Sequence, residues 1–222
     1  MHKKASYLMD LFVSRNIDVG FINETYFESP SNLATSTVQA SNYKIFPSLQ
    51  YGRKKGIAII VKDSIKVSSL VIPNSYSTFD VITSEVIDIN KKRLSLVCLY
   101  RPPRIGALFN RFLDEFSSFL SSLVISNTRY IIAGDLNIPK NLPNDGRTIK
   151  WMDIIHEFNL GYLDITEPTF VSGNTLEWVL FDFGSSNDVK LLKRCRKSMA
   201  LEYGITFLCC FLLMLIFMAN MT

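Results

Sequence analysis

Short apolar runs and longer amphipathic stretches alternate along most of the chain, which predicts a mixture of strands and helices. Six runs have the length and the apolar or alternating character of strands, and they cover residues 17–22, 56–61, 79–89, 94–100, 130–133 and 176–181. Three stretches carry apolar side chains at helical spacing, and they cover residues 5–16, 108–123 and 151–158. This mixture favours a layered α/β (α+β) sandwich.

The end of the chain breaks this pattern. Residues 203–221 (YGITFLCCFLLMLIFMANM) contain no charged side chain, and about 20 mainly apolar residues suffice to cross a bilayer. Five cations lie within residues 190–197, and Lys and Arg beside a span favour the cytoplasmic side. We therefore predict a domain over 1–187, a basic linker over 188–202 and a transmembrane helix over 203–221. A core helix is the alternative for the last segment.

Composition and charge narrow the class of protein. Hydrophobic residues make up 48% of the chain and charged residues 20%, which is typical of a globular domain and excludes disorder as the main state. The net charge of +4 comes from the 190–197 cluster, so the rest of the chain is nearly neutral. That balance disfavours a protein that coats nucleic acid over its whole surface. The four cysteines form no C-x-x-C pair, which indicates a reducing compartment.

Carboxylates follow two of the predicted strands. Glu24 comes after strand 17–22, and Asp135 comes after strand 130–133 within the sequence Gly-Asp-Leu-Asn. Strand ends in layered sheets border ligand sites, and a hard cation such as Mg²⁺ would relieve the repulsion between two acids there. Asn137 can donate to a phosphate or a water without adding charge. Tyr100 ends a third strand, just before a rigid Arg-Pro-Pro turn, and its hydroxyl could touch the same ligand.

Each of these residues also has a purely structural interpretation. An Asp after a Gly is a common turn former, Glu24 could be an exposed loop acid, and Tyr100 could serve packing alone. Only their combination in one chain favours chemistry.

The segments that contain these residues resemble the endonuclease/exonuclease/phosphatase superfamily in their order and spacing. They are IDVGFINET (17–25), GIAIIVKDSI (56–65), LSLVCLYRPPR (94–104), YIIAGDLNIP (130–139) and PTFVSGNTLEWVL (168–180). Within the superfamily, YRPP, GDLN and NTLEWV together are most similar to the endonuclease domain of non-LTR (LINE-type) retrotransposon polyproteins.

The resemblance implies a four-layer αββα sandwich and cleavage of DNA phosphodiesters with Mg²⁺ or Mn²⁺. It implies that Glu24 holds the metal, that Tyr100 contacts the scissile phosphate and that Asp135 orients the attacking water. It also implies that Asn137 stabilises the pentacovalent charge. Thr169 matches a polar site residue of the family, and Glu177 matches a catalytic Asp.

Three differences from the family pattern predict a weak or inactive enzyme. The family opens with a strand that carries a catalytic Asn, whereas Met1 starts at the helix that follows this strand. Glu177 is one methylene longer than the family's Asp. The family closes with a Ser-Asp-His motif, whereas this chain diverges after residue 184. His2 and His156 are poor replacements, because His2 is terminal and His156 falls on the polar face of its predicted helix.

Three functions follow as hypotheses. The first is an impaired nuclease domain derived from a retrotransposon. The second is a membrane-anchored phosphoesterase of the same superfamily that acts on lipid or sugar phosphates, and the third is a non-enzymatic membrane-anchored remnant. The expected location is a membrane, with a single pass and the N-terminal domain in the cytosol. The nucleus is expected if the tail is not inserted.

Overall fold

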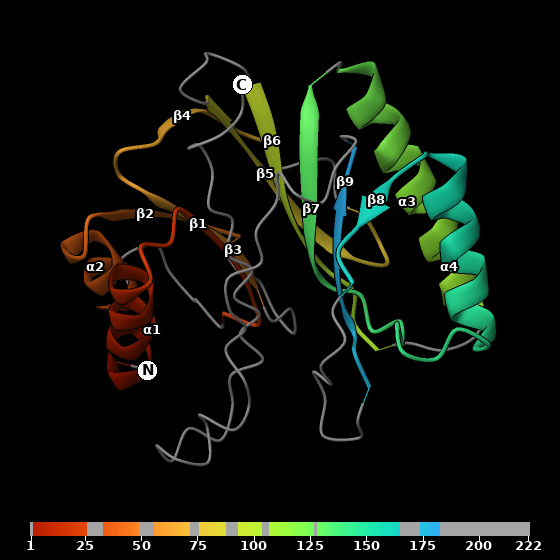
Figure 1. The fold of residues 1–222 in the computed structure, drawn as a ribbon, viewed down its shortest axis with the longest axis horizontal. Helices are drawn as coiled ribbons and strands as arrows, with labels where there is room; N and C mark the ends of the chain where they lie inside the picture. The colour runs from red at the N-terminus through yellow and green to blue at the C-terminus, as the bar shows by residue number, and fades with distance from the viewer. Residues whose placement is uncertain are drawn as a thin grey trace.

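The computed structural model describes residues 2–25, 33–48, 56–71, 76–87, 93–103, 107–126, 128–164 and 174–182. Its first half forms a three-stranded antiparallel sheet with two helices on its outer side (Figure 1). The helices are α1 (His2–Ser14) and α2 (Leu33–Ala40), and the strands are β1 (Val19–Asn23), β2 (Tyr43–Pro47) and β3 (Ile57–Lys62), in the order β1-β3-β2.

The second sheet is larger and mixed. Its strands are β4 (Lys66–Val71), β5 (Asp80–Ile87), β6 (Arg93–Tyr100), β7 (Arg129–Asp135), β8 (Gly161–Tyr162) and β9 (Glu177–Phe181). They follow the order β4-β5-β6-β7-β9-β8, and only β6 and β7 run parallel. The crossover between these two strands is α3 (Ala107–Ile125), and α4 (Gly146–Glu157) lies beside it on the same face (Figure 1). A parallel pair needs such a long connection.

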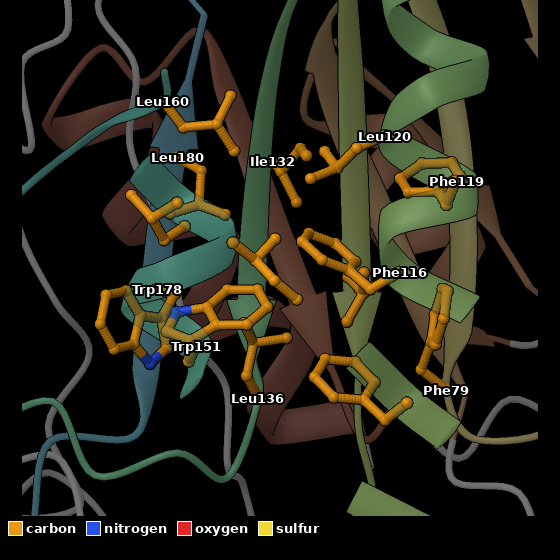
Figure 2. Packing of buried hydrophobic residues seen from close by; sticks show 14 of the residues in the cluster. Phe79, Phe116, Phe119, Leu120, Ile132, Leu136, Trp151, Leu160, Trp178 and Leu180 are labelled. Atoms are coloured by element: carbon orange, nitrogen blue, oxygen red, sulfur yellow. The ribbon is translucent and has the colours of Figure 1, made fainter. Parts of the chain in front are cut away.

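Three apolar layers hold the elements together and confirm the predicted four-layer αββα sandwich. One layer packs α1 and α2 on the small sheet, and a second lies between the two sheets. The third packs α3 and α4 on the large sheet and is dense in aromatic rings, as Figure 2 shows. Phe116 lies near its centre, with its ring centroid 4.8 Å from that of Trp151. Large aromatic side chains dominate core energetics in this way.

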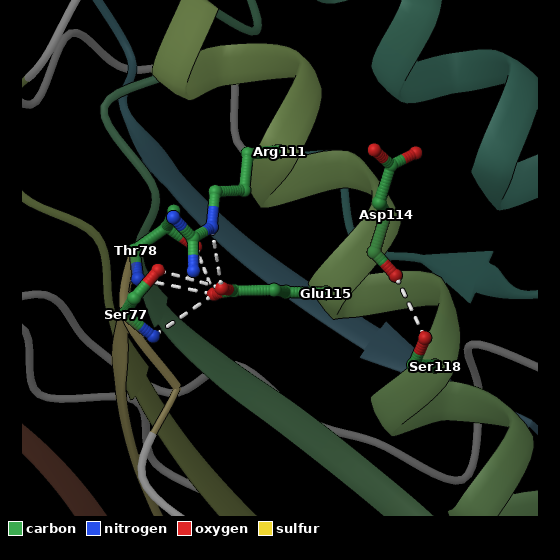
Figure 3. A network of polar contacts seen from close by, with 6 residues as sticks. All are labelled: Ser77, Thr78, Arg111, Asp114, Glu115 and Ser118. Atoms are coloured by element: carbon green, nitrogen blue, oxygen red, sulfur yellow. Dashed lines mark hydrogen bonds and ion pairs between the residues drawn. The ribbon is translucent and has the colours of Figure 1, made fainter.

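Glu115 joins α3 to the turn before β5, on the side of α3 shown in Figure 3. Its carboxylate accepts hydrogen bonds from the backbone N–H and the hydroxyl of both Ser77 and Thr78, at 2.6–3.0 Å, and from Arg111 at 3.1 Å. Hydrogen bonds to a charged acceptor are among the stronger ones in proteins. This network fixes the long crossover helix to the turn that leads into β5.

The alternation of side chains along β6, β7 and β9 decides what the site contains. Leu94, Leu96 and Cys98 of β6 point into the layer between the sheets, whereas Val97 and Leu99 point toward the helices. Tyr100 therefore continues the side that faces the small sheet. In β7 the same side carries Ile131, Ala133 and Asp135, and in β9 it carries Glu177, Val179 and Phe181, since each is two residues from the next.

Gly134 is required by the close approach of β6 and β7. A Cβ atom at this position would lie 1.7 Å from the carbonyl oxygen of Leu99 on the neighbouring strand. No rotamer change relieves a clash with backbone, so the Gly before Asp135 is set by packing.

All nine predicted elements of the domain are present, with shifts of a few residues at their ends. The largest shift is at α4, which begins at Gly146 because Asp145 caps it and accepts a hydrogen bond from the backbone N–H of Arg147 at 2.9 Å. The linker at 188–202, the predicted span at 203–221 and the C-terminal hydrophobic helix lie outside the described residues. Within the described ranges, no helix is both long and apolar enough to cross a bilayer.

Candidate active site

Three polar side chains lie side by side where β6, β7 and β9 meet. Tyr100 is the register partner of Asp135 across the parallel pair, and Asp135 is the partner of Glu177 across the antiparallel pair. All three face the small sheet, at the edge where the apolar layer between the sheets ends. Asp135 and Glu177 are each 6% exposed. The two acids are therefore buried neighbours.

Glu24 reaches the same place from the small sheet. It follows the last residue of β1 and has a positive φ of 57°, a conformation that side chains other than Gly rarely adopt. Glu24 therefore does not continue the alternation of side chains along β1. The hydroxyl of Tyr100 donates a hydrogen bond to Oε1 of Glu24 at 3.0 Å. The structure thus brings Glu24, Tyr100 and Asp135 together at one edge of the sandwich, with Tyr100 next to both acids.

The electrostatics of Asp135 reflect this crowding. Burial raises the pKa of Asp135 to about 8, and the negative charges of Glu177 and Glu24 act in the same direction. The backbone N–H of Asn137, which donates to Oδ1 at 2.9 Å, and the charge of Arg101 act to lower it. Burial and the neighbouring carboxylates therefore favour the protonated form of Asp135, and a bound cation would favour its ionised form.

The chemistry of these groups fits a hard divalent cation. Carboxylate oxygens are the ligands that Mg²⁺ and Mn²⁺ prefer, and the mutual repulsion of Asp135, Glu24 and Glu177 is what a cation relieves. In the described part of the chain, no three acidic, His or Cys side chains already stand close enough to hold a metal together. Glu24, Asp135 and Glu177 are the residues that would hold such an ion.

Asn23 is a polar residue of this region that sequence reasoning missed. It is 1% exposed, and its Nδ2 has no hydrogen-bond partner among the described residues. Its Oδ1 accepts a contact from Sγ of Cys98 at 3.5 Å. The signal in the sequence is its alternation with Val19 and Phe21, which places it on the face of β1 that points toward the large sheet.

Asn137 is engaged by the backbone. It has a positive φ of 51°, which Asn tolerates better than most residues, and its Nδ2 donates to the carbonyl of Arg101 at 2.7 Å. An amide group carries two N–H donors. One N–H of Asn137 donates to Arg101. The predicted role of Asn137 toward a phosphate would use the second N–H and remains a prediction.

Arg101 is the second residue that sequence reasoning missed, because the sequence indicated only a rigid turn at this point. Its side chain is 98% buried, since the residue is 2% exposed. Nε donates to the carbonyl of Leu136 at 2.5 Å, and Nη2 donates to the carbonyl of Asn137 at 2.9 Å. Its position directly after the buried last five residues of β6 (LVCLY) was the available signal for burial.

The helices that carry the two histidines lie apart from this cluster. Thr169 lies outside the described residues. His156 is exposed near the end of α4, as its place on the polar face predicted. Helix α4 covers the opposite face of the large sheet, so His156 is not part of the cluster. Helix α1, in which His2 is the first residue, covers the outer side of the small sheet.

Comparison with known proteins agrees with this arrangement. The family model described as the endonuclease/exonuclease/phosphatase family matches residues 1–179. The chain belongs to this family. Members of the endonuclease/exonuclease/phosphatase family generally depend on divalent metals. The comparison with curated protein sequences finds no match.

Solved structures share the fold of this family member at low sequence identity. ANGEL2, a 2′,3′-cyclic phosphatase, superposes with a TM-score of 0.60 at 13% identity, over 88% of this chain and 78% of that chain. The human nocturnin catalytic domain gives 0.57 at 12% identity, over 81% and 75%. Truncated TDP2 of Caenorhabditis elegans gives 0.55 at 14% identity, over 82% and 77%. The chain therefore has the fold of phosphodiesterases and phosphatases of this family.

Proposed function

We propose that the chain is a phosphodiester hydrolase of the DNA-endonuclease type that depends on Mg²⁺ or Mn²⁺, and that its turnover is slow or absent. The observation that carries the proposal is the position of Asp135, buried between Tyr100 and Glu177 and coupled to Glu24. Acids crowded into a buried site are costly to the fold, and such groups cluster at functional sites.

Each side chain has a definite task in this proposal. Glu24 and Asp135 would hold the cation, which when bound supplies neutralisation of the charge on phosphate oxygens. Asp135 would orient the attacking water and, in the ionised form that a bound cation favours, would accept its proton. The second amide N–H of Asn137 would donate to the phosphate oxygens, and the hydroxyl of Tyr100 would do so in place of its hydrogen bond to Glu24.

Two features support impaired turnover. Glu177 stands where the family resemblance predicts an Asp, so its carboxylate reaches about one methylene further. In the described ranges, no histidine belongs to the cluster around Asp135. Loss of one general acid–base group typically costs about 10²–10⁴-fold in rate.

The origin in a non-LTR retrotransposon is supported by the sequence segments YRPP, GDLN and NTLEWV. The family match itself is broader than this branch. Genomic sequence downstream of the chain would test the origin, since codons for Ser-Asp-His followed by reverse-transcriptase motifs in another frame are expected. Their absence would favour a phosphoesterase for lipid or sugar phosphates, which the uncharged segment 203–221 also fits.

Nicking of supercoiled plasmid and binding of Mn²⁺ test the activity. The full-length chain in mild detergent is compared with Asp135→Ala and with Asp153→Ala, an exposed acid on α4 that serves as the matched control. We expect weak Mn²⁺ binding that Asp135→Ala removes and Asp153→Ala retains, with nicking at or barely above background. Robust nicking that disappears in Asp135→Ala would overturn the impairment, and absence of metal binding in the parent would overturn the metal site.

The membrane location is a separate proposal that rests on residues 190–197 and 203–221. The full-length protein is expected to stay in the membrane fraction during alkaline carbonate extraction, and deletion of residues 190–222 is expected to release it. Release of the intact chain would contradict the anchor.

A further inference from the structure

We propose that Arg101 is a positioning residue, which holds the turn Asp135–Asn137 so that the carboxylate of Asp135 and the amide of Asn137 point toward the substrate. The inference rests on the proposed hydrolase function of this site. Arg101 acts through the backbone of the turn, because its backbone N–H and its guanidinium donate to the carbonyls of Asp135, Leu136 and Asn137.

The contacts of Arg101 are reciprocal and extend the pairing of β6 and β7 beyond the end of their ladder. The last register pair of the two strands is Tyr100 with Asp135. Beyond it, the backbone N–H of Arg101 donates to the carbonyl of Asp135 at 2.9 Å, and its carbonyl accepts from Nδ2 of Asn137. Together with the two side-chain hydrogen bonds, these contacts join Arg101 to the three consecutive residues 135–137.

The side chain of Arg101 donates to backbone carbonyls that lie beyond the sheet and, among the described residues, have no N–H of a neighbouring strand opposite them. The carbonyls of Leu136 and Asn137 lie past the end of β7, and the chain on the β6 side continues with Pro102 and Pro103, which have no N–H to donate. The guanidinium supplies donors to both carbonyls. It thereby fixes the turn in which Asn137 adopts its positive φ.

The guanidinium is itself held in place by α3. Its central carbon lies 5.3 Å from the ring centroid of Phe109 and 5.2 Å from that of Phe112, which is cation–π distance. Burial lowers the pKa of Arg101 to about 10, so the group remains charged at neutral pH. Arg101 therefore connects three elements: the end of β6, the turn after β7 and the first part of α3.

This geometry requires an arginine. A guanidinium is planar and carries its donors on separate nitrogens in a fixed fork, whereas the three donors of a lysine ammonium are all on one nitrogen. Arg101→Lys keeps the charge and most of the length but cannot donate to both carbonyls from the same place. Arg93→Lys is the matched control, because Arg93 is the exposed first residue of β6, the strand that ends just before Arg101.

The test compares the full-length parent with these two variants by hydrogen exchange in NMR. We expect the side-chain amide of Asn137, assigned by its disappearance in Asn137→Asp, to exchange about 10-fold faster in Arg101→Lys. The backbone amide of Val97, in the middle of β6, should keep its protection. Arg93→Lys should resemble the parent in both signals. Unchanged exchange at Asn137 in a folded Arg101→Lys variant would overturn the proposal.

Metal binding and turnover separate this inference from the proposed function. In Arg101→Lys we expect weaker Mn²⁺ binding and, where nicking by the parent is measurable, a rate lower by about 10–100-fold, since misplacement by about 1 Å has effects of that size. A parent that binds no Mn²⁺ contradicts the proposed function, and the exchange at Asn137 still decides the role of Arg101.

A measurement on the parent alone covers the case in which Arg101→Lys fails to fold. The Nε–H of Arg101 should exchange far more slowly than that of Arg93. Equal exchange at the two sites would show that the guanidinium is not fixed, and would overturn the proposal.

Discussion

The two faces of the large sheet bury very different side chains. The face against α3 and α4 is aromatic, with the ring centroids of Phe112 and Phe116 only 5.8 Å apart. The face against the small sheet is mainly aliphatic and ends in Tyr100, Asp135 and Glu177. The helix side therefore supplies stability in excess, and the opposite side can hold groups that lower it. This division explains how one sheet supports both a core and an acidic cluster.

The strongest test of the comparison is removal of an aromatic ring from the helix side. Phe116→Ala is expected to lower the free energy of unfolding by about 3–5 kcal/mol, because it leaves a large cavity in a rigid core. Ile131→Val on the opposite face should cost about 0.5–1.5 kcal/mol. Urea denaturation measures both. A cost for Phe116→Ala no larger than that for Ile131→Val would contradict the division between the faces.

The second test concerns the acidic end of the opposite face. The pKa of Asp135 is raised to about 8 from an ordinary 3.8, so the folded state binds a proton that the unfolded state releases between these values. In EDTA, the stability that Asp135 contributes should therefore be fully present below about pH 4 and be lost as the pH rises from there through 8. Asp135→Asn should flatten this profile and be more stable at pH 8, by about 2–4 kcal/mol.

Thermal unfolding across this pH range measures the effect, and Mn²⁺ provides the control. The cation should stabilise the parent at pH 8 and leave Asp135→Asn unchanged, because it binds the ionised acid. Parallel pH profiles for the two proteins would show that Asp135 titrates normally and that the cluster is looser than the structure indicates.

The third test concerns the attachment of the crossover helix. Burial acts to raise the pKa of Glu115, but hydrogen bonds from Ser77, Thr78 and Arg111 lower it to about 2 (Figure 3). Its contribution to stability should be present above about pH 4.5 and be lost as the pH falls toward 2. Glu115→Gln is expected to cost about 1–3 kcal/mol at pH 7.

Asp114 is the matched control for this network. It precedes Glu115 on α3 and is exposed, and Figure 3 shows its carboxylate away from Ser77 and Thr78. Asp114→Asn should leave stability within about 0.5 kcal/mol of the parent. Equal losses in the two variants would mean that charge on the helix, and not the network, is responsible.

The smallest expected effect on stability comes from a buried hydroxyl in the layer between the two sheets. The hydroxyl of Ser84 on β5 is buried and has no hydrogen-bond partner among the described residues. Ser84→Ala removes this uncompensated polar group, so it should raise stability by up to about 1 kcal/mol. A loss of similar size would indicate that the hydroxyl has a partner, such as a buried water.

The sequence predicted the elements whose apolar pattern is strong. The strands β3, β6 and β7 and the helix α3 were placed to within a few residues, because each buries a continuous run or a wide stripe. The elements that were not predicted are α2, β2, β4 and β8. Helix α2 (LATSTVQA) is short and rich in hydroxyls, β2 and β4 are edge strands with half-polar patterns, and β8 has two residues.

The candidate site was predictable where side chains follow strand ends. Alternation along β6 and β7 is sufficient to put Tyr100 and Asp135 on one face, and Glu24 could be placed near them from the family resemblance. The burial of Asn23 and Arg101 had a signal in the sequence, but their partners could not be predicted. These partners are tertiary contacts: the rings of α3 for Arg101, and the facing β6 for Asn23. A charged residue beside two prolines is equally typical of an exposed turn.

The contact between Gly134 and Leu99 affects how related sequences should be interpreted. Since backbone packing alone demands this Gly, a copy that had drifted away from all chemistry would still retain it as long as it folds. Its presence is therefore no sign of activity. The neighbouring carboxylate behaves in the opposite way, because an amide at position 135 would fit the same space with less cost to the fold. In a set of related copies, loss of the acid at position 135 would mark a folded relic, whereas retention of Gly134 would say nothing about activity.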